Sequence, residues 1–209
     1  MMPAAFRNWT ESEEAFVRNL VWAVVALAGM ASAQADGLSY SYAEGGFGMV
    51  DFDAIDDEGD GYFIGGSLGL GTNWLGFVEY GLAEFDVSGA SADVEEIQVG
   101  FGGHFPMSKS ADFVGRIAYV DQSVEVSAPG FGSASADENG YMLSAGVRGM
   151  ALERLDLMGA IEYVDVGDAD DTGLMLRGLY QFTDMFSLGA RAGFSDDATE
   201  YGLFARFTF

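Results

Sequence analysis

Few residues in this chain could support catalysis, and they are not spaced as the members of a catalytic pair would be. His104 is the single histidine, and cysteine is absent. Adjacent aspartates occur at three points in acidic stretches: Asp56-Asp57, Asp170-Asp171 and Asp196-Asp197. A nucleophile needs a general base within hydrogen-bond reach, and this pattern supplies no such pair. Zinc-ligand spacing, phosphate-binding loops and dinucleotide fingerprints are also missing from the sequence, so we expect no enzyme, no catalytic residue and no cofactor.

The charged residues are more informative than the nucleophiles. The 209 residues include 33 Asp and Glu against 9 Lys and Arg, a formal net charge of −24. This balance argues against a nucleic-acid partner, because phosphates require basic side chains. Five arginines and four glutamates stand at alternate positions of extended stretches, and we expect them to form one network: Glu44, Glu79, Glu96, Arg116, Arg148, Glu162, Arg177, Arg191 and Arg206.

A second group of carboxylates lies in the first acidic stretch, flanked by glycine. Its members are Asp51, Asp53, Asp56, Asp57, Glu58 and Asp60. Carboxylate oxygens are calcium ligands, so divalent cations are candidate partners of this loop. The stretch departs from the D-x-[DN]-x-[DN]-G register of a calcium loop, and a solvated, self-repelling loop is the alternative. No metal site is assigned here.

The last ten residues, Glu200–Phe209, show which elements must position these charges. Tyr201, Leu203 and Phe207 share one parity with the terminal Phe209, whereas Arg206 has the other. A period of two indicates an extended strand with two different faces. The same alternation recurs in nine earlier segments: 38–50, 61–71, 74–86, 93–105, 111–126, 138–150, 155–166, 172–182 and 186–195.

The alternation separates charged from apolar side chains. From the second segment onward, the set of alternate positions that holds the apolar residues includes charged residues only at segment ends. These are Glu84, Asp121 and Asp165. An arginine facing lipid at mid-bilayer costs about 2–4 kcal/mol, so a cleared apolar face is typical of strands that contact lipid. We therefore expect an all-β fold: a closed, antiparallel, up-and-down transmembrane β-barrel. Ten strands fit the segment count, and eight strands are the alternative.

An even strand number places both chain ends on the same side of the membrane. Five connections, near residues 55, 89, 132, 169 and 197, then face outward. Four shorter ones, near residues 72, 108, 152 and 184, face the opposite side. The stretch 127–137, rich in Gly, Ser and Ala, is expected to be a loop.

The expected network of arginines and glutamates would then lie in the lumen. Buried charges are tolerated when they are paired and hydrogen-bonded, so each arginine should meet a carboxylate. We expect Glu162 and Arg177 at comparable heights on neighbouring strands, with Arg191 beside Arg177. The network could fill a closed barrel, as interiors of small barrels are largely filled. Alternatively, it could form the filter of a narrow ion- or small-solute-conducting pore.

The amino-terminal residues have the composition of an export signal. The apolar run 20–29 follows Arg18 and precedes Ala31-Ser32-Ala33. This run is too short to span a membrane as a helix. A basic residue, an apolar region and an A-x-A site predict a cleaved signal peptide over residues 1–33, followed by the barrel over 34–209. A short amphipathic helix is the alternative.

The stretch Gly37–Phe47 (G-L-S-Y-S-Y-A-E-G-G-F), the stretch Gly61–Gly66 (G-Y-F-I-G-G) and the closing strand resemble a known family. It comprises small bacterial outer-membrane barrels once described as secreted quorum factors, within the wider OmpA-like and OmpX-like class. The resemblance implies a Gram-negative cell envelope, contacts with outer-membrane lipid and lipopolysaccharide, and a monomer. It also implies that the barrel-assembly machinery reads the closing strand through Tyr201, Leu203, Phe207 and Phe209.

Roles in envelope integrity and surface adhesion are common in that class, so the resemblance implies a structural or surface-interaction role. A narrow porin remains the alternative, and a barrel enzyme acting on lipid or peptide is less favoured. Divalent cations that bridge anionic lipopolysaccharide could engage the first acidic loop. Fold alone does not decide between these functions.

Overall fold

The computed structural model describes residues 38–52, 58–87, 89–130, 132–196 and 198–209. The signal peptide predicted over residues 1–33 lies outside these residues. No helix among the described residues is long and apolar enough to cross a membrane. The described residues form ten strands: β1 (Tyr42–Phe52), β2 (Glu58–Leu70), β3 (Trp74–Val87), β4 (Ala90–Pro106), β5 (Ala111–Ala128), β6 (Gly132–Leu152), β7 (Leu155–Val166), β8 (Ala169–Gln181), β9 (Phe186–Phe194) and β10 (Ala198–Thr208).

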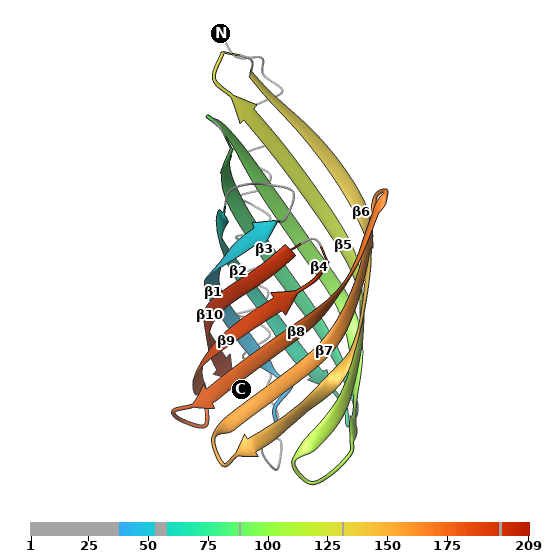
Figure 1. Ribbon diagram of the computed structural model, residues 1–209. Helices are drawn as coiled ribbons and strands as arrows, with labels where there is room; N and C mark the ends of the chain where they lie inside the picture. The colour runs from blue at the N-terminus through green and yellow to red at the C-terminus, as the bar shows by residue number, and fades with distance from the viewer. Residues whose placement is uncertain (1–37, 53–57, 88, 131, 197) are drawn as a thin grey trace.

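Each strand pairs antiparallel with its neighbours in sequence, and β1 pairs with β10 to close the barrel (Figure 1). The prediction of a closed ten-stranded barrel is therefore confirmed over the eight-stranded alternative. The β1–β10 register runs without interruption from Tyr42 opposite Thr208 to Phe52 opposite Ala198. Closure leaves no unpaired sheet edge through the body of the barrel, as a bilayer requires.

The two faces of the strands differ as the alternation predicts. Phe101 and Ile117 are 66% and 55% exposed on the outer surface, where lipid would cover them. On the opposite parity, Val114, Met142 and Phe204 are buried in the lumen. Interior glycines make room for the larger inward side chains. A Cβ at Gly189, for example, would stand 2.7 Å from the Phe204 ring.

The stretch 127–137 is not the loop expected from its composition. β5 continues to Ala128, β6 begins at Gly132, and Ser127 pairs with Ser133. Gly130 and Gly132 adopt positive φ angles of 87° and 90°, which side chains with a Cβ rarely allow. The β5–β6 hairpin projects beyond the other strands at the upper end of the molecule (Figure 1).

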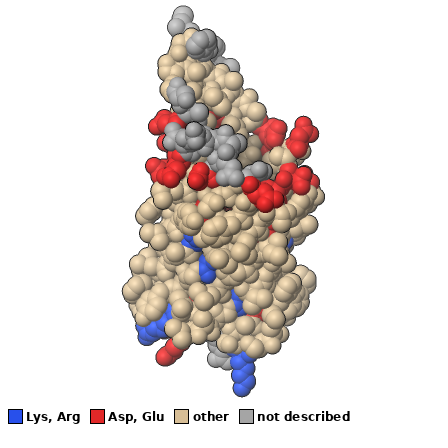
Figure 2. Space-filling view, in the orientation of Figure 1, with Lys and Arg blue, Asp and Glu red and all other residues tan. Residues whose placement is uncertain are grey.

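The two ends of the barrel differ in charge. Acidic side chains gather around the end from which the β5–β6 hairpin projects, above a broad belt of mostly uncharged atoms (Figure 2). We call this end the hairpin end. The opposite end carries the connections at 71–73, 107–110, 153–154 and 182–185, and we call it the turn end. Basic side chains appear near the turn end in the same view.

Candidate functional site in the lumen

A single carboxylate holds two arginines inside the lumen. Glu44 of β1 is 5% exposed, and Arg206 of β10 donates to its Oε2 from Nε at 2.7 Å. Arg177 of β8 donates to the other carboxylate oxygen. The Arg206 guanidinium also lies 3.7 Å from the Tyr42 ring centroid, and Arg177 lies 4.7 Å from the centroid of Phe204. These contacts join both sides of the β1–β10 seam to β8.

A second ion pair lies closer to the turn end. Arg148 of β6 donates to Asp156 Oδ2 from Nε at 3.0 Å and from Nη2 at 2.7 Å. Its Nη1 donates to the Ser39 carbonyl oxygen at 2.8 Å. Asp156 is 4% exposed. Arg148 thus connects the β6–β7 wall to the chain segment that precedes β1.

That segment, residues 38–41, contacts side chains of β4 and β5 across the lumen. The Tyr40 hydroxyl donates to Asp112 Oδ2 at 2.9 Å, and His104 Nδ1 lies 3.1 Å from the same oxygen. The Tyr40 and His104 rings stack with centroids 4.0 Å apart. Burial raises the pKa of the Tyr40 hydroxyl, which keeps it protonated as a donor to Asp112. His104 therefore takes part in a structural cluster at the turn end.

The remaining pairs lie toward the hairpin end. Arg116 donates to Glu162 Oε1 at 2.9 Å, and Arg191 donates to Glu79 Oε1 at 3.1 Å. Arg191 also lies 4.0 Å from Glu200. The expectation that Glu162 and Arg177 lie at comparable heights on neighbouring strands is wrong. The β7–β8 register places Gly173 opposite Glu162 and Met158 opposite Arg177, so Glu162 reaches Arg116 across β6 instead.

Two of the nine predicted network residues have their side-chain partners only outside that set. Glu96 accepts a hydrogen bond from Gln98 at 2.8 Å, and Arg148 pairs with Asp156. Sequence reasoning missed three buried or partly buried acids, which the structure places in the lumen: Asp112, Asp156 and Glu200. Each shares the parity of an interior residue on its own strand, and that parity was the available signal. Asp112 and Asp156 stand next to turns, where strand ends are hardest to place.

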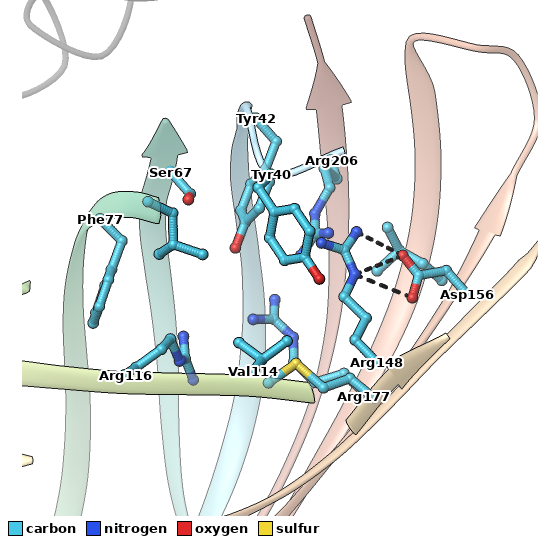
Figure 3. Close-up of a pocket in the computed structure, with 13 residues that line it drawn as sticks. Tyr40, Tyr42, Ser67, Phe77, Val114, Arg116, Arg148, Asp156, Arg177 and Arg206 are labelled. Carbon is cyan, nitrogen blue, oxygen red and sulfur yellow. Dashed lines mark hydrogen bonds and ion pairs between the residues drawn. The ribbon is translucent and has the colours of Figure 1, made fainter. Parts of the chain in front are cut away.

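Among the described residues, two cavities of different size lie in the lumen. The smaller, about 30 Å³, lies between the pairs Glu44–Arg206 and Arg148–Asp156 (Figure 3). The larger, about 280 Å³, is lined at the hairpin end by residues that include Glu79, Glu96, Glu162, Arg191 and Glu200. Arg116 and Arg177 line both cavities and so mark the boundary between them.

The first acidic stretch is only partly described. Asp53, Asp56 and Asp57 lie outside the described residues. Asp51 at the end of β1 is opposite Glu58 at the start of β2, and Asp60 is opposite Met49. Among the described residues, no group of three or more acidic or histidine side chains is arranged to hold a metal ion.

The residues predicted to form the assembly signal lie on the lipid-facing side of β10. Tyr201, Leu203 and Phe207 are exposed on the outer surface. Phe209 follows the end of β10, where its backbone N–H donates to the Ser41 carbonyl oxygen at 3.1 Å. The ring of Phe209 lies 6.4 Å from that of Phe207.

The chain is similar to one protein family and to several solved structures. The model of the outer membrane protein beta-barrel domain family matches residues 21–182. Ail, the attachment invasion locus protein of Yersinia pestis, is 13% identical and aligns over 82% of this chain and 100% of its own, with a TM-score of 0.46. Neisserial surface protein A is 13% identical over 83% and 100%, with a TM-score of 0.48. The β-barrel domain of Pseudomonas aeruginosa OprF is 13% identical over 82% and 98%, with a TM-score of 0.44. No curated protein sequence matches the chain.

Proposed function

This chain belongs to the outer membrane protein beta-barrel domain family and is located in the bacterial outer membrane, and we propose that it is a closed barrel with a structural or surface-interaction role. The family match confirms the resemblance to small outer-membrane barrels found in the sequence. The proposal concerns what such a barrel does once it is in the membrane.

The observation that carries this proposal is the filled turn-end half of the lumen. The pairs Glu44–Arg206 and Arg148–Asp156 lie there with Tyr40, and the remaining space is about 30 Å³. A hydrated ion that entered the larger cavity would meet this layer. Passage would require breaking charge-assisted hydrogen bonds, which are the stronger kind in proteins.

Single-channel recording in planar bilayers tests closure. We expect no stable openings from the wild-type protein. The double substitution Tyr40→Ala with Arg148→Ala removes the two largest side chains that join residues 38–41 to the barrel wall, and it should produce openings. Tyr40→Phe retains the ring and should stay closed. Stable openings of the wild-type protein would instead support the narrow-porin alternative, which the 280 Å³ cavity at the hairpin end favours.

The surface role is supported by the acidic hairpin end (Figure 2). A rim of carboxylates repels the phosphates of lipopolysaccharide unless divalent cations lie between them. We therefore propose that the hairpin end faces outward and contacts lipopolysaccharide through bridging cations, or a cationic surface on another cell. A protease site inserted at Gly132 should be cleaved on intact cells, whereas one at Ser108 should be protected. The reverse pattern would invert the orientation.

Three further proposals concern export, oligomeric state and membrane assembly. Residues 1–33 would be removed as a signal peptide, so sequencing the amino terminus of the membrane form should begin at or shortly after residue 34. The barrel would be monomeric, as sedimentation in detergent can measure. The assembly machinery would read Tyr201, Leu203, Phe207 and Phe209, and deleting Phe209 should lower the amount of assembled barrel in the membrane.

We propose no enzymatic role. His104, the only histidine, is engaged with Tyr40 and Asp112 at the turn end, away from the larger cavity. Acyl transfer or hydrolysis that is abolished by His104→Ala would contradict this proposal.

A further inference from the structure

The small cavity of Figure 3 is surrounded by hydrogen-bond donors that lack acceptors. Ser67 Oγ, Arg116 Nε and Arg177 Nε are buried and have no hydrogen-bond partner among the described residues. Ser67 is 4% exposed, and the Arg177 side chain is 9% exposed. All three residues line the same cavity of about 30 Å³, and they come from three separate strands, β2, β5 and β8 (Figure 3).

The chemistry of these atoms specifies what could bind them. An arginine Nε–H donates and never accepts, and a serine hydroxyl can donate as well. A buried donor without a partner costs about 1–3 kcal/mol, and more when it is charged. An acceptor bound inside the cavity would therefore satisfy all three donors.

The charge around the cavity has the same implication. Its lining holds four guanidinium groups and a single carboxylate, that of Asp156: Arg116, Arg148, Arg177 and Arg206 are the cations. Two more carboxylates reach these arginines from outside the lining, Glu44 and Glu162. Asp112, which does not line the cavity, is engaged by Tyr40 and His104. These four guanidinium groups form ion pairs with three carboxylates, because Glu44 holds both Arg177 and Arg206.

We infer that this cavity binds one small monovalent anion, a halide such as chloride. Arginine cannot shed its proton, and two buried guanidiniums that share the single carboxylate of Glu44 attract a further anion. Leu75, Val114 and Leu179 form apolar parts of the wall, which strengthens the attraction between an anion and the guanidiniums. A cavity of about 30 Å³ has room for one or two species the size of a water molecule. A water molecule could also accept from the donors, but it carries no charge to offset the four guanidiniums of the lining.

Bromide is the direct probe of the site. The protein, extracted from outer membranes in detergent, would be crystallised with sodium bromide, and anomalous scattering would be measured at the bromine edge. We expect one peak within hydrogen-bond distance of Arg116 Nε and Arg177 Nε. An ordered density without anomalous signal at this position identifies water and overturns the inference.

Thermal unfolding tests whether the anion belongs to the folded state. At fixed sodium concentration, the wild-type unfolding temperature should rise when chloride or bromide replaces gluconate, because a ligand of the native state stabilises it. Ser67→Ala removes one donor and should raise the half-saturating halide concentration about tenfold. Ser67→Asp places a carboxylate at the cavity and should abolish the dependence on halide.

Ser187→Ala is the matched control. Ser187 is 3% exposed on β9 and does not line the cavity, so this variant should keep the wild-type halide response. Comparing variants under the same salts removes general effects of anions on unfolding. An equal unfolding temperature of the wild-type protein in chloride and gluconate, or an undiminished response in Ser67→Asp, overturns the inference.

Discussion

The cavities in the two halves of the lumen are lined by the same residue types in different proportions. Toward the turn end, four arginines and the carboxylate of Asp156 line a cavity of about 30 Å³. Toward the hairpin end, Arg191 stands among Glu79, Glu96 and Glu200 beside a cavity of about 280 Å³. The first cavity is small and rich in arginine, and the second is larger and richer in carboxylates.

This difference indicates where ion pairs stabilise the barrel. Coulombic attraction strengthens as water is excluded, and so does the cost of leaving one partner unpaired. Glu44 and its two arginines are each less than a tenth exposed, whereas the Glu79 side chain is 29% exposed. Removing a carboxylate should therefore cost most at the turn end and progressively less toward the hairpin end.

The largest effect is expected for Glu44→Gln. This change leaves both Arg177 and Arg206 without a carboxylate, and breaking a buried pair costs about 3–5 kcal/mol. Urea unfolding of the protein refolded into lipid vesicles would measure the loss of unfolding free energy. The control is Glu44→Asp, which retains the charge and should recover part of the stability. A Glu44→Gln variant as stable as the wild-type protein would show that the pairing at this layer is dispensable.

Glu162→Gln should have an intermediate effect. Its partner Arg116 loses a hydrogen bond to a charged acceptor, worth about 1.5–3 kcal/mol, in a side chain that is 14% exposed. Asp170→Asn, at the hairpin end of β8, is the control and should stay within roughly 0.5 kcal/mol of the wild type. Equal urea midpoints for the two variants would place Glu162 outside any buried network.

The smallest effect of the three is expected for Glu79→Gln. The pair it breaks is partly hydrated, and Arg191 keeps Glu200 at 4.0 Å, so the loss should be about 1 kcal/mol or less. Added salt should reduce the difference between this variant and the wild type, because exposed charges are screened. If Glu79→Gln proved as costly as Glu44→Gln, the distinction between the two halves would fail.

Most of the fold was predictable because lipid and lumen impose opposite chemistry on alternate residues. Segments such as Leu155–Val166 were placed with the correct bounds and faces. The stretch 127–137 was misjudged for a physical reason. Water surrounds both faces of the projecting hairpin, so nothing selects apolar residues at every second position, and Ser127 and Ser133 pair without that signature.

The site was less predictable than the fold. The alternation of residues along a strand indicates that Arg116 and Glu162 face inward. It carries no information about which inward side chains contact each other across the lumen. That pairing depends on strand tilt and register, which place Gly173 rather than Arg177 opposite Glu162. The role of Tyr40 was also inaccessible, because it precedes β1 and its contacts with His104 and Asp112 follow from the path of the chain across the lumen.

The pairing of β1 with β10 has a consequence for folding kinetics. Glu44 and Arg206 are direct partners in that register, yet they are 162 residues apart in the sequence. Contacts of such high sequence separation form late, since a long loop must close first. A slip of one residue during closure would turn Arg206 toward lipid, at a cost of about 2–4 kcal/mol. Formation of the Glu44–Arg206 ion pair should therefore favour the correct β1–β10 register when the barrel closes. Refolding of Arg206→Ser, followed by the mobility of unheated samples on gels, should show more than one slowly converting closed form.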